Sequence, residues 1–219
     1  MASEYSNPLD LLYQIVNDIW PGDAPAPASG APAGKPAAVQ GQQPDSAKAP
    51  EAPPFEEFWR RADERVDWTE VLLHEKPTGT TPSPALWCRF HQMAPQVLEG
   101  DLAAYGEVLQ LANPLSDLKP YATRFTVSAP DADSAEVNFE ALPCDVEEKR
   151  LLAGLALRCA RDVLALLPIK AVTVHGSMPD GTCLEVTYPY LSLRKVQFSF
   201  IDPVAYAEEM GCSFRTPEA

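Results

Sequence analysis

Apolar residues near the start of the chain recur at steps of three and four, which is the spacing of one face of an amphipathic α-helix. Residues 1–20 are therefore expected to contain a helix of about three turns, with Asn7 as its cap and Pro8 in its first turn. A helix this short is marginal alone in water, so its apolar face needs a surface to lie against. The side chains that would form this face are Leu9, Leu12, Tyr13, Val16, Ile19 and Trp20.

Residues 21–54 consist almost wholly of Pro, Ala, Gly, Gln and Ser, with no aromatic residue and a single valine. Such a composition buries too little apolar surface to offset the entropy lost on ordering. The segment is predicted to be a disordered linker with an end-to-end distance of about 30 Å. No second linker divides the rest of the chain, so residues 55–219 are expected to form a single folded domain.

Residues 55–112 show the spacing of helices. PFEEFWRRADERVDWTEVLLHE is predicted to be one helix with a dense charged face, in which Trp59 lies on the apolar stripe with Phe55 and Trp68 lies near its edge. The prolines and glycine of KPTGTTPSP then end this helix. A helical pair is expected in ALWCRFHQMAPQVLEG and DLAAYGEVLQLA, with Gly100 as the break between them and Asn113-Pro114 ending the second.

The period of the pattern changes to two after residue 121. ATRFTVS and SAEVNFEAL alternate apolar with polar residues, which predicts a hairpin with APDAD as its turn. A long helix is expected next, capped by Asp145 and running to about Leu167. Its buried stripe should be Leu152, Leu155, Cys159, Val163 and Leu166.

A second hairpin is predicted in VTVHGSMPDGTCLEVTY. Pro179, Asp180 and Gly181 suit a three-residue loop, because proline fits the first turn position and glycine supplies the left-handed third. Counting outward from this loop places His175 opposite Glu185 and Ser177 opposite Cys183. One face then carries Val172, Val174, Leu184, Val186 and Tyr188, and the other carries Thr173, His175, Ser177, Cys183, Glu185 and Thr187.

The rest of the chain predicts a further strand and a short helix. Val196, Phe198 and Phe200 alternate with polar residues, and Asp202 and Gly211 would bound a terminal helix over 203–210. The order β-β-α-β-β over 122–201 predicts an α+β fold, in which antiparallel hairpins form a sheet with the long helix on one face.

Four pieces of this region, LAGLALRCARDVLALLP, AVTVHG, TCLEVTY and FIDPVAYAEEMG, lie in the order of a long helix, a strand pair and an Ile-Asp-Pro segment. Over residues 151–211 the chain thereby resembles a domain found near the C-terminus of uncharacterised bacterial proteins. The resemblance implies a bacterial origin and an α+β accessory domain, and it supplies no active residues.

The chain is strongly acidic, with a formal net charge of −14 and a pI near 4.5. Like charges repel, so neither a nucleic acid nor an anionic membrane is the expected partner. The N-terminus has no positively charged leader, and no apolar run is long enough to span a bilayer. Five cysteines at irregular spacing, without a Cys-x-x-Cys pair, suit reduced thiols, and a cytoplasmic location is therefore predicted.

The candidate chemistry lies on the polar face of the second hairpin. His175, held by Glu185, could act as a base toward Ser177 or Cys183. Diagonal neighbours in antiparallel strands are about 7 to 8 Å apart, which is long for a base and a nucleophile, so an exposed His–Glu pair is the preferred interpretation. A metal site at His175, Cys183 and Glu185 would lack a fourth ligand, because His74 and His91 lie in the helical region.

A nuclease-type metal site is a further alternative, from Pro179-Asp180 followed by Glu185. Its spacing is too short, and Thr187 stands where a lysine is needed. The acidity of the chain also disfavours a DNA-cutting enzyme.

The favoured hypothesis is a non-enzymatic interaction or adaptor protein that needs no cofactor. The tethered helix would order in a groove of a protein partner, with Leu12, Tyr13, Val16, Ile19 and Trp20 as anchors. Alternatively, this helix folds back onto its own domain. The competing functions are an assembly chaperone and a small enzyme using the face formed by His175, Glu185 and Cys183.

Overall fold

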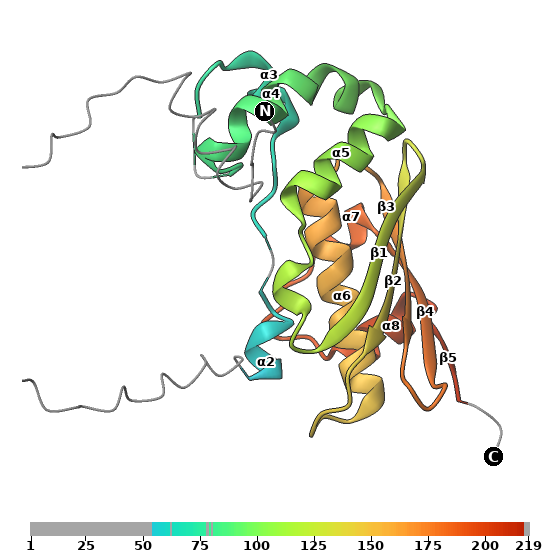
Figure 1. Cartoon of the computed structure of the whole chain (residues 1–219). Helices are drawn as coiled ribbons and strands as arrows, with labels where there is room; N and C mark the ends of the chain where they lie inside the picture. The colour runs from blue at the N-terminus through green and yellow to red at the C-terminus, as the bar shows by residue number, and fades with distance from the viewer. Residues whose placement is uncertain (1–53, 62, 78, 80, 217–219) are drawn as a thin grey trace, which may run out of the picture. The chain divides into compact units, whose positions relative to one another are not determined.

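The computed structural model describes residues 54–61, 63–77, 79 and 81–216 of the chain (Figure 1). The predicted N-terminal helix and linker, residues 1–53, lie outside the described residues. Helices and a five-stranded sheet make up the described part, which confirms the α+β fold class. Among the described helices, none combines the length and the apolar character needed to cross a membrane.

The sheet has the strand order β1-β2-β3-β4-β5. The strands are β1 (Ala122–Asp131), β2 (Ser134–Ala141), β3 (Ala171–Ser177), β4 (Cys183–Pro189) and β5 (Ser213–Arg215). Neighbouring strands pair antiparallel except β2 and β3, which are parallel, so the prediction of an antiparallel sheet is wrong at its centre.

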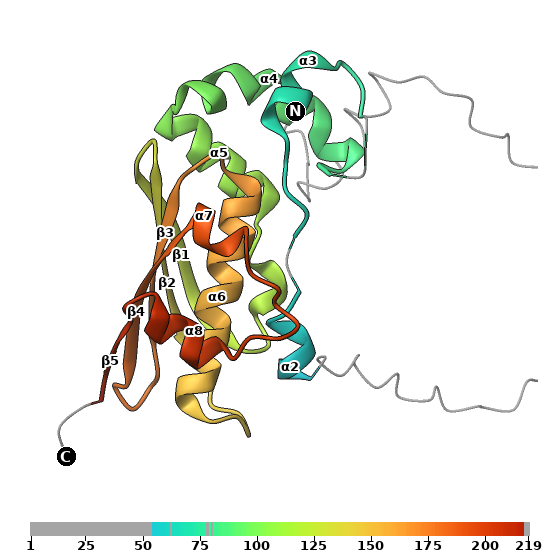
Figure 2. The same cartoon turned by 180° about the vertical axis from the view of Figure 1, so that it is seen from behind.

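The long helix α6 (Glu148–Leu166) explains the parallel pair. Its 19 residues span about 28 Å, and the eight residues of β2 span about 26 Å. The helix therefore returns the chain along the whole length of β2, and β3 starts again at the end where β2 started. Figure 1 shows α6 lying against one face of the sheet, and Figure 2 shows α8 (Pro203–Glu209) beside it.

The predicted stripe of α6 is buried as expected, but most of the remaining residues of the helix are buried as well. One side of α6 contacts the sheet, and other sides contact α8 and the segment that begins at Phe55. A Cβ on Gly154 would come within 2.6 Å of the Phe55 ring and 3.3 Å of Trp59, so glycine is needed where these rings approach. The helix begins with Glu147 at its cap rather than Asp145, two residues later than predicted.

The single helix predicted from Phe55 is wrong. The structure has α2 (Phe55–Phe58) and α3 (Trp68–Leu73), with irregular chain between them. Asp67 starts α3, because its side chain accepts hydrogen bonds from the amides of Thr69 and Glu70 at 3.0 and 3.1 Å.

Trp59 and Trp68 lie at the two ends of the irregular segment, and both side chains reach the core. Trp59 is 0% exposed and Trp68 is 3% exposed, so the expected difference in their environments is also wrong. The Trp68 indole N–H donates to the Leu166 carbonyl at 2.7 Å, and the Val66 amide donates to the Ala165 carbonyl at 2.8 Å. Both bonds satisfy carbonyls at the end of α6, which a continuous exposed helix would leave without these partners.

The predicted helical pair is confirmed as α4 (Pro84–Glu99) and α5 (Leu102–Ala112). Gly100 and Asn113 end the two helices in the left-handed conformation, and Asp101 caps α5. A short 3-10 helix, η1 (Ser116–Leu118), leads into β1. The Tyr105 hydroxyl donates to the Ala132 carbonyl at 3.2 Å, which places the start of α5 against the β1–β2 turn.

The second hairpin has the predicted register throughout, with His175 opposite Glu185 and Ser177 opposite Cys183. Gly181 has a φ of 95°, as its place in the turn requires. The helix α8 and its cap Asp202 are also confirmed.

The strand expected at Val196 to Phe200 does not form. The structure has α7 (Tyr190–Leu193) followed by turns, and Phe200 is 84% exposed. The last strand is β5, whose three residues are too few to show an alternation in the sequence.

Candidate functional site

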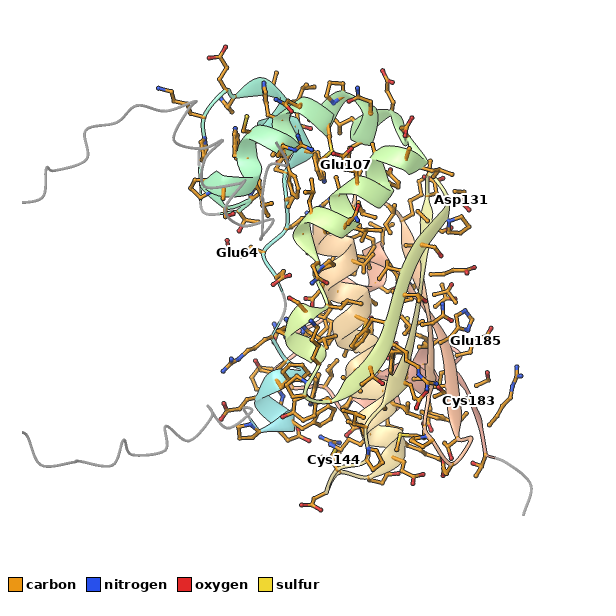
Figure 3. All side chains as sticks on the ribbon, in the orientation of Figure 1. Glu64, Glu107, Asp131, Cys144, Cys183 and Glu185 are labelled. Carbon is orange, nitrogen blue, oxygen red and sulfur yellow. The ribbon has the colours of Figure 1, made fainter. Side chains whose placement is uncertain are left out.

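The four polar residues singled out in the second hairpin lie on one face of β3 and β4. Their alternate neighbours Val174 and Leu184 are buried against the helix side, so the polar set must point the other way. Figure 3 shows Cys183 and Glu185 on the side of the sheet away from α6. The prediction that this face is polar and turned from the core is confirmed.

The geometry of this face does not pair a base with a nucleophile. The Ser177 hydroxyl donates to the Phe139 carbonyl at 3.3 Å, across to β2. His175 Nδ1 lies 3.8 Å from a Glu185 carboxylate oxygen, an ion-pair distance that is too long for a hydrogen bond. The same carboxylate oxygen lies 3.9 Å from Arg215, so His175 is not its sole neighbour.

A shallow depression of about 360 Å³ covers this part of the sheet. Arg124 and Glu140 close one side of it with an ion pair at 2.7 Å, and Arg215 and Glu185 close the other. The two carboxylates and two guanidinium groups balance, so the depression has no strong preference for either sign of ligand charge. Ligand pockets of this size usually bury most of their ligand, whereas this depression is open on the face of a sheet.

Sequence reasoning did not include Arg124 and Arg215 in this cluster. Arg124 approaches only because β2 pairs with β3 in parallel, and Arg215 approaches only because β5 exists. Neither pairing follows from the alternation of residues within a single hairpin.

A second cluster of charges was also missed, and it is buried. Arg158 and Asp162, one turn apart on α6, are 3% and 0% exposed and join through a hydrogen bond of 2.6 Å. Arg158 also donates to Asp117 at 2.9 Å and to the Phe58 carbonyl at 3.2 Å. Asp162 accepts the amide N–H of Asp63 at 3.0 Å. The signal in the sequence was an Arg–Asp pair at i, i+4 in the apolar part of the helix, where Arg158 and Asp162 lie next to the predicted stripe residues Cys159 and Val163.

Burial governs the electrostatics of this cluster. Desolvation raises the pKa of Asp162 to about 7, although Arg158 and the Asp63 amide favour its charged form. Desolvation also raises the pKa of Asp63 and lowers the pKa of Arg161 to about 10.

The arginines of α6 hold the irregular segment that precedes α3. Arg161 donates to the carbonyls of Trp59 and Arg60 at 3.3 and 2.9 Å, and its guanidinium lies 3.6 Å from the centre of the Phe198 ring. Arg158 adds its bond to the Phe58 carbonyl. Because two of these carbonyls, those of Trp59 and Arg60, lie outside the helices, the arginine bonds fix the chain rather than expose a reactive group.

Within residues 54–216, gaps excepted, no three or more His, Cys, Asp or Glu side chains are grouped so that they could hold a metal ion. His91 instead lies 2.6 Å from the Val71 carbonyl, where it joins α4 to α3. All five cysteines are described and free. Cys159 is fully buried, and burial raises the pKa of its thiol, so it is a core residue.

The proposed partner-binding side chains Leu12, Tyr13, Val16, Ile19 and Trp20 lie outside the described residues. Comparison of the chain with protein-family models, with curated proteins and with solved structures finds no match. The resemblance of residues 151–211 to a domain of bacterial proteins therefore stays a prediction.

Proposed function

We propose that the protein is a non-enzymatic interaction or adaptor protein, which presents its N-terminal segment to a protein partner and uses its α+β domain as a folded anchor. The observation that carries the proposal is a contrast between two parts of the chain. Residues 9–20 have an apolar stripe, whereas the described domain covers its central helix α6 with its own sheet, α8 and the segment starting at Phe55.

The charge of the N-terminal segment suggests the chemistry of its partner. Residues 1–34 contain Glu4, Asp10, Asp18 and Asp23 and no lysine or arginine. An apolar groove with a basic rim would accept Leu12, Val16 and Trp20 and would balance these carboxylates. The free cysteines suit a reducing compartment such as the cytoplasm.

The polar face of the second hairpin gives the enzyme alternative little support. His175 lies 3.8 Å from Glu185, and the Ser177 hydroxyl donates to the Phe139 carbonyl instead of to His175. An assembly chaperone would use the same docking segment, so it differs from an adaptor only in the identity and fate of the partner.

The test compares three forms of the full chain in cells of its source. One form is unchanged, and one carries Leu12→Ala, Val16→Ala, Ile19→Ala and Trp20→Ala. The matched control carries Gln14→Ala and Asn17→Ala, two polar positions outside the apolar stripe of the predicted helix. Quantitative mass spectrometry then measures the proteins that co-purify with each form. We expect the stripe variant to lose its partner by at least about tenfold, which corresponds to about 1.4 kcal/mol, and the control to keep it.

Co-purification of the same partners with the stripe variant would refute the proposal. A purified partner must also bind a peptide of residues 1–20 directly, with the same ranking of variants. Enzymatic turnover that is lost on His175→Ala without loss of stability would favour the enzyme alternative instead.

A further inference from the structure

The two edges of the sheet differ in length. β5 at one edge has three residues, and β1 at the other has ten. Only β2 pairs with β1 among the described strands. An edge strand presents backbone N–H and C=O groups that can pair with another chain.

Irregular backbone interrupts the regular pairing of β1 with β2 toward both ends of the strand. A bulge lies between Thr123 and Thr126, where Arg124 has a φ of 53°, and the register shifts again between Ser128 and Asp131. Regular pairing with β2 is kept at Thr126, Val127 and Ser128. An added strand could therefore pair over only a few residues, and stable binding needs apolar contacts beside the edge.

An apolar groove of about 260 Å³ lies beside this edge, between β1 and α5. Its apolar lining includes Leu109, Phe125 and Val127. Gly106 also lines it, in the middle of α5, and a Cβ added there would meet no atom within 4 Å. Glycine is the poorest helix former after proline, and no atom of the described domain approaches Gly106 closely enough to require a glycine there.

This surface carries little charge, although β1 ends at Asp131. Residues 121–130 carry no carboxylate and one charged residue, Arg124. The only charged residue of α5 is Glu107, which pairs with Arg89 at 3.1 Å. Leu98, near the end of α4, and Leu102, at the start of α5, are also exposed.

We infer that the β1 edge and the α5 groove form an interface between two copies of this chain. A chain with a net charge of −14 repels its copies, and the repulsion is weakest where neutral surfaces meet. Depletion of charge with apolar contacts is also the composition of an interface core.

Antiparallel edge pairing is compatible with a two-fold axis, since the same patch then contributes on both sides. Pairing two copies of β1 in this way joins two five-stranded sheets into one. Both α5 helices lie on the same side of the joined sheet, where Gly106 leaves space for a close approach. The backbone pairs give register, and the groove supplies apolar contacts beside them.

This dimer would present two N-terminal segments. A partner with two binding sites would bind it more tightly than either segment alone, with no new contact. The dimer interface is formed by the described domain alone, so its test does not depend on whether the N-terminal segment binds a partner.

The experiment measures the mass of the full-length protein by sedimentation velocity and light scattering up to about 200 µM. The unchanged chain should be a dimer. The variant Thr126→Lys with Ser128→Lys places like charges of both copies at the edge and should raise the dimer dissociation constant at least about tenfold. In the monomer it is tolerated, because Ser128 lies opposite Glu136.

The complementary variant carries Thr126→Glu, at a position opposite the uncharged Asn138, and should also be monomeric. An equimolar mixture of the lysine and glutamate variants should form dimers of mixed composition, as native mass spectrometry would show. The control Thr187→Glu with Gln197→Glu adds two charges at exposed positions away from β1 and should stay dimeric. Thermal unfolding of each variant checks that it keeps its fold.

If the unchanged chain is a monomer over this concentration range, the inference is wrong. The β1 edge would then be available to a strand of another protein. A lysine variant that stays dimeric would overturn the inference as well. So would loss of the dimer in the control, because the effect of charge would then not belong to the β1 edge.

Discussion

Two of the pairs of opposite charges on this domain differ in nearly every consequence. His175 and Glu185 face water on β3 and β4, with 38% and 54% of their side chains exposed and 3.8 Å between them. Arg158 and Asp162 are 3% and 0% exposed on α6, and they share a hydrogen bond of 2.6 Å. The conspicuous pair in the sequence is the exposed one, but the structure depends on the buried pair.

The reason lies in the solvent around each pair. An exposed pair exchanges its contact for water at little cost, so it contributes about 0 to 1 kcal/mol. A buried charge that loses its partner cannot recover water and leaves the full desolvation penalty. Arg158 and Asp162 also satisfy Asp63, Phe58 and Asp117, so their loss would release the chain between α2 and α3.

The largest effect is expected from Arg158→Met. Without Arg158 the buried Asp162 loses the partner that favours its charged form, so at pH 8 it must either stay charged without a partner or take up a proton, and the free energy of unfolding should fall by about 3 to 5 kcal/mol. Urea unfolding followed by tryptophan fluorescence would measure it, since Trp59 and Trp68 lie on the released segment. Arg215→Met, next to the exposed Glu185, is the matched control and should cost less than about 1 kcal/mol. Equal losses in the two variants would mean that burial does not separate the two pairs.

The second largest effect is expected in the pH dependence of the free energy of unfolding. The pKa of Asp162 in the folded protein is about 7, above the value of about 3.9 in an unfolded chain, because burial disfavours its charged form. Between these values the folded state holds a proton that the unfolded state has released, so this group's contribution to stability falls as the pH rises from about 4 to 7.

Asp162→Asn removes this titration and keeps the side chain's size. Between pH 5 and 7 the unchanged protein should lose about 1 to 2 kcal/mol more stability than the variant does. Urea unfolding at several pH values measures this difference in slope. Parallel curves for the two proteins would show that Asp162 does not titrate in this range.

The sequence predicted best where one short segment determines the geometry. Pro179, Asp180 and Gly181 specify a turn, and the alternation on either side then determines which side chains are opposed. Gly100 likewise ends α4 through its backbone N–H, and Asp202 starts α8 through its side chain, which accepts hydrogen bonds from nearby amides.

The structural features that the sequence did not predict depend on residues far away along the chain. Residues 55–73 have a helical spacing, but Trp59 and Trp68 gain more burial by packing on α6 than a continuous helix allows. The parallel pairing of β2 with β3 depends on how a whole helix crosses the sheet, and Arg124 reaches the polar face only as a result. The charges of Arg158 and Asp162 are buried by a segment about 100 residues earlier, which no local pattern reports.

The smallest effect is expected at the exposed pair. His175→Gln keeps a polar side chain at this position and should change the free energy of unfolding by less than about 0.5 kcal/mol, because the contact of 3.8 Å lies in water. Urea unfolding at pH 6 and pH 8 measures it, with Thr173→Gln on the same strand as the control for polarity and volume. A loss above about 1 kcal/mol in His175→Gln, without a similar loss in the control, would show that His175 and Glu185 are coupled more strongly than an exposed pair can be, and the distinction between the two pairs would then not rest on solvent alone.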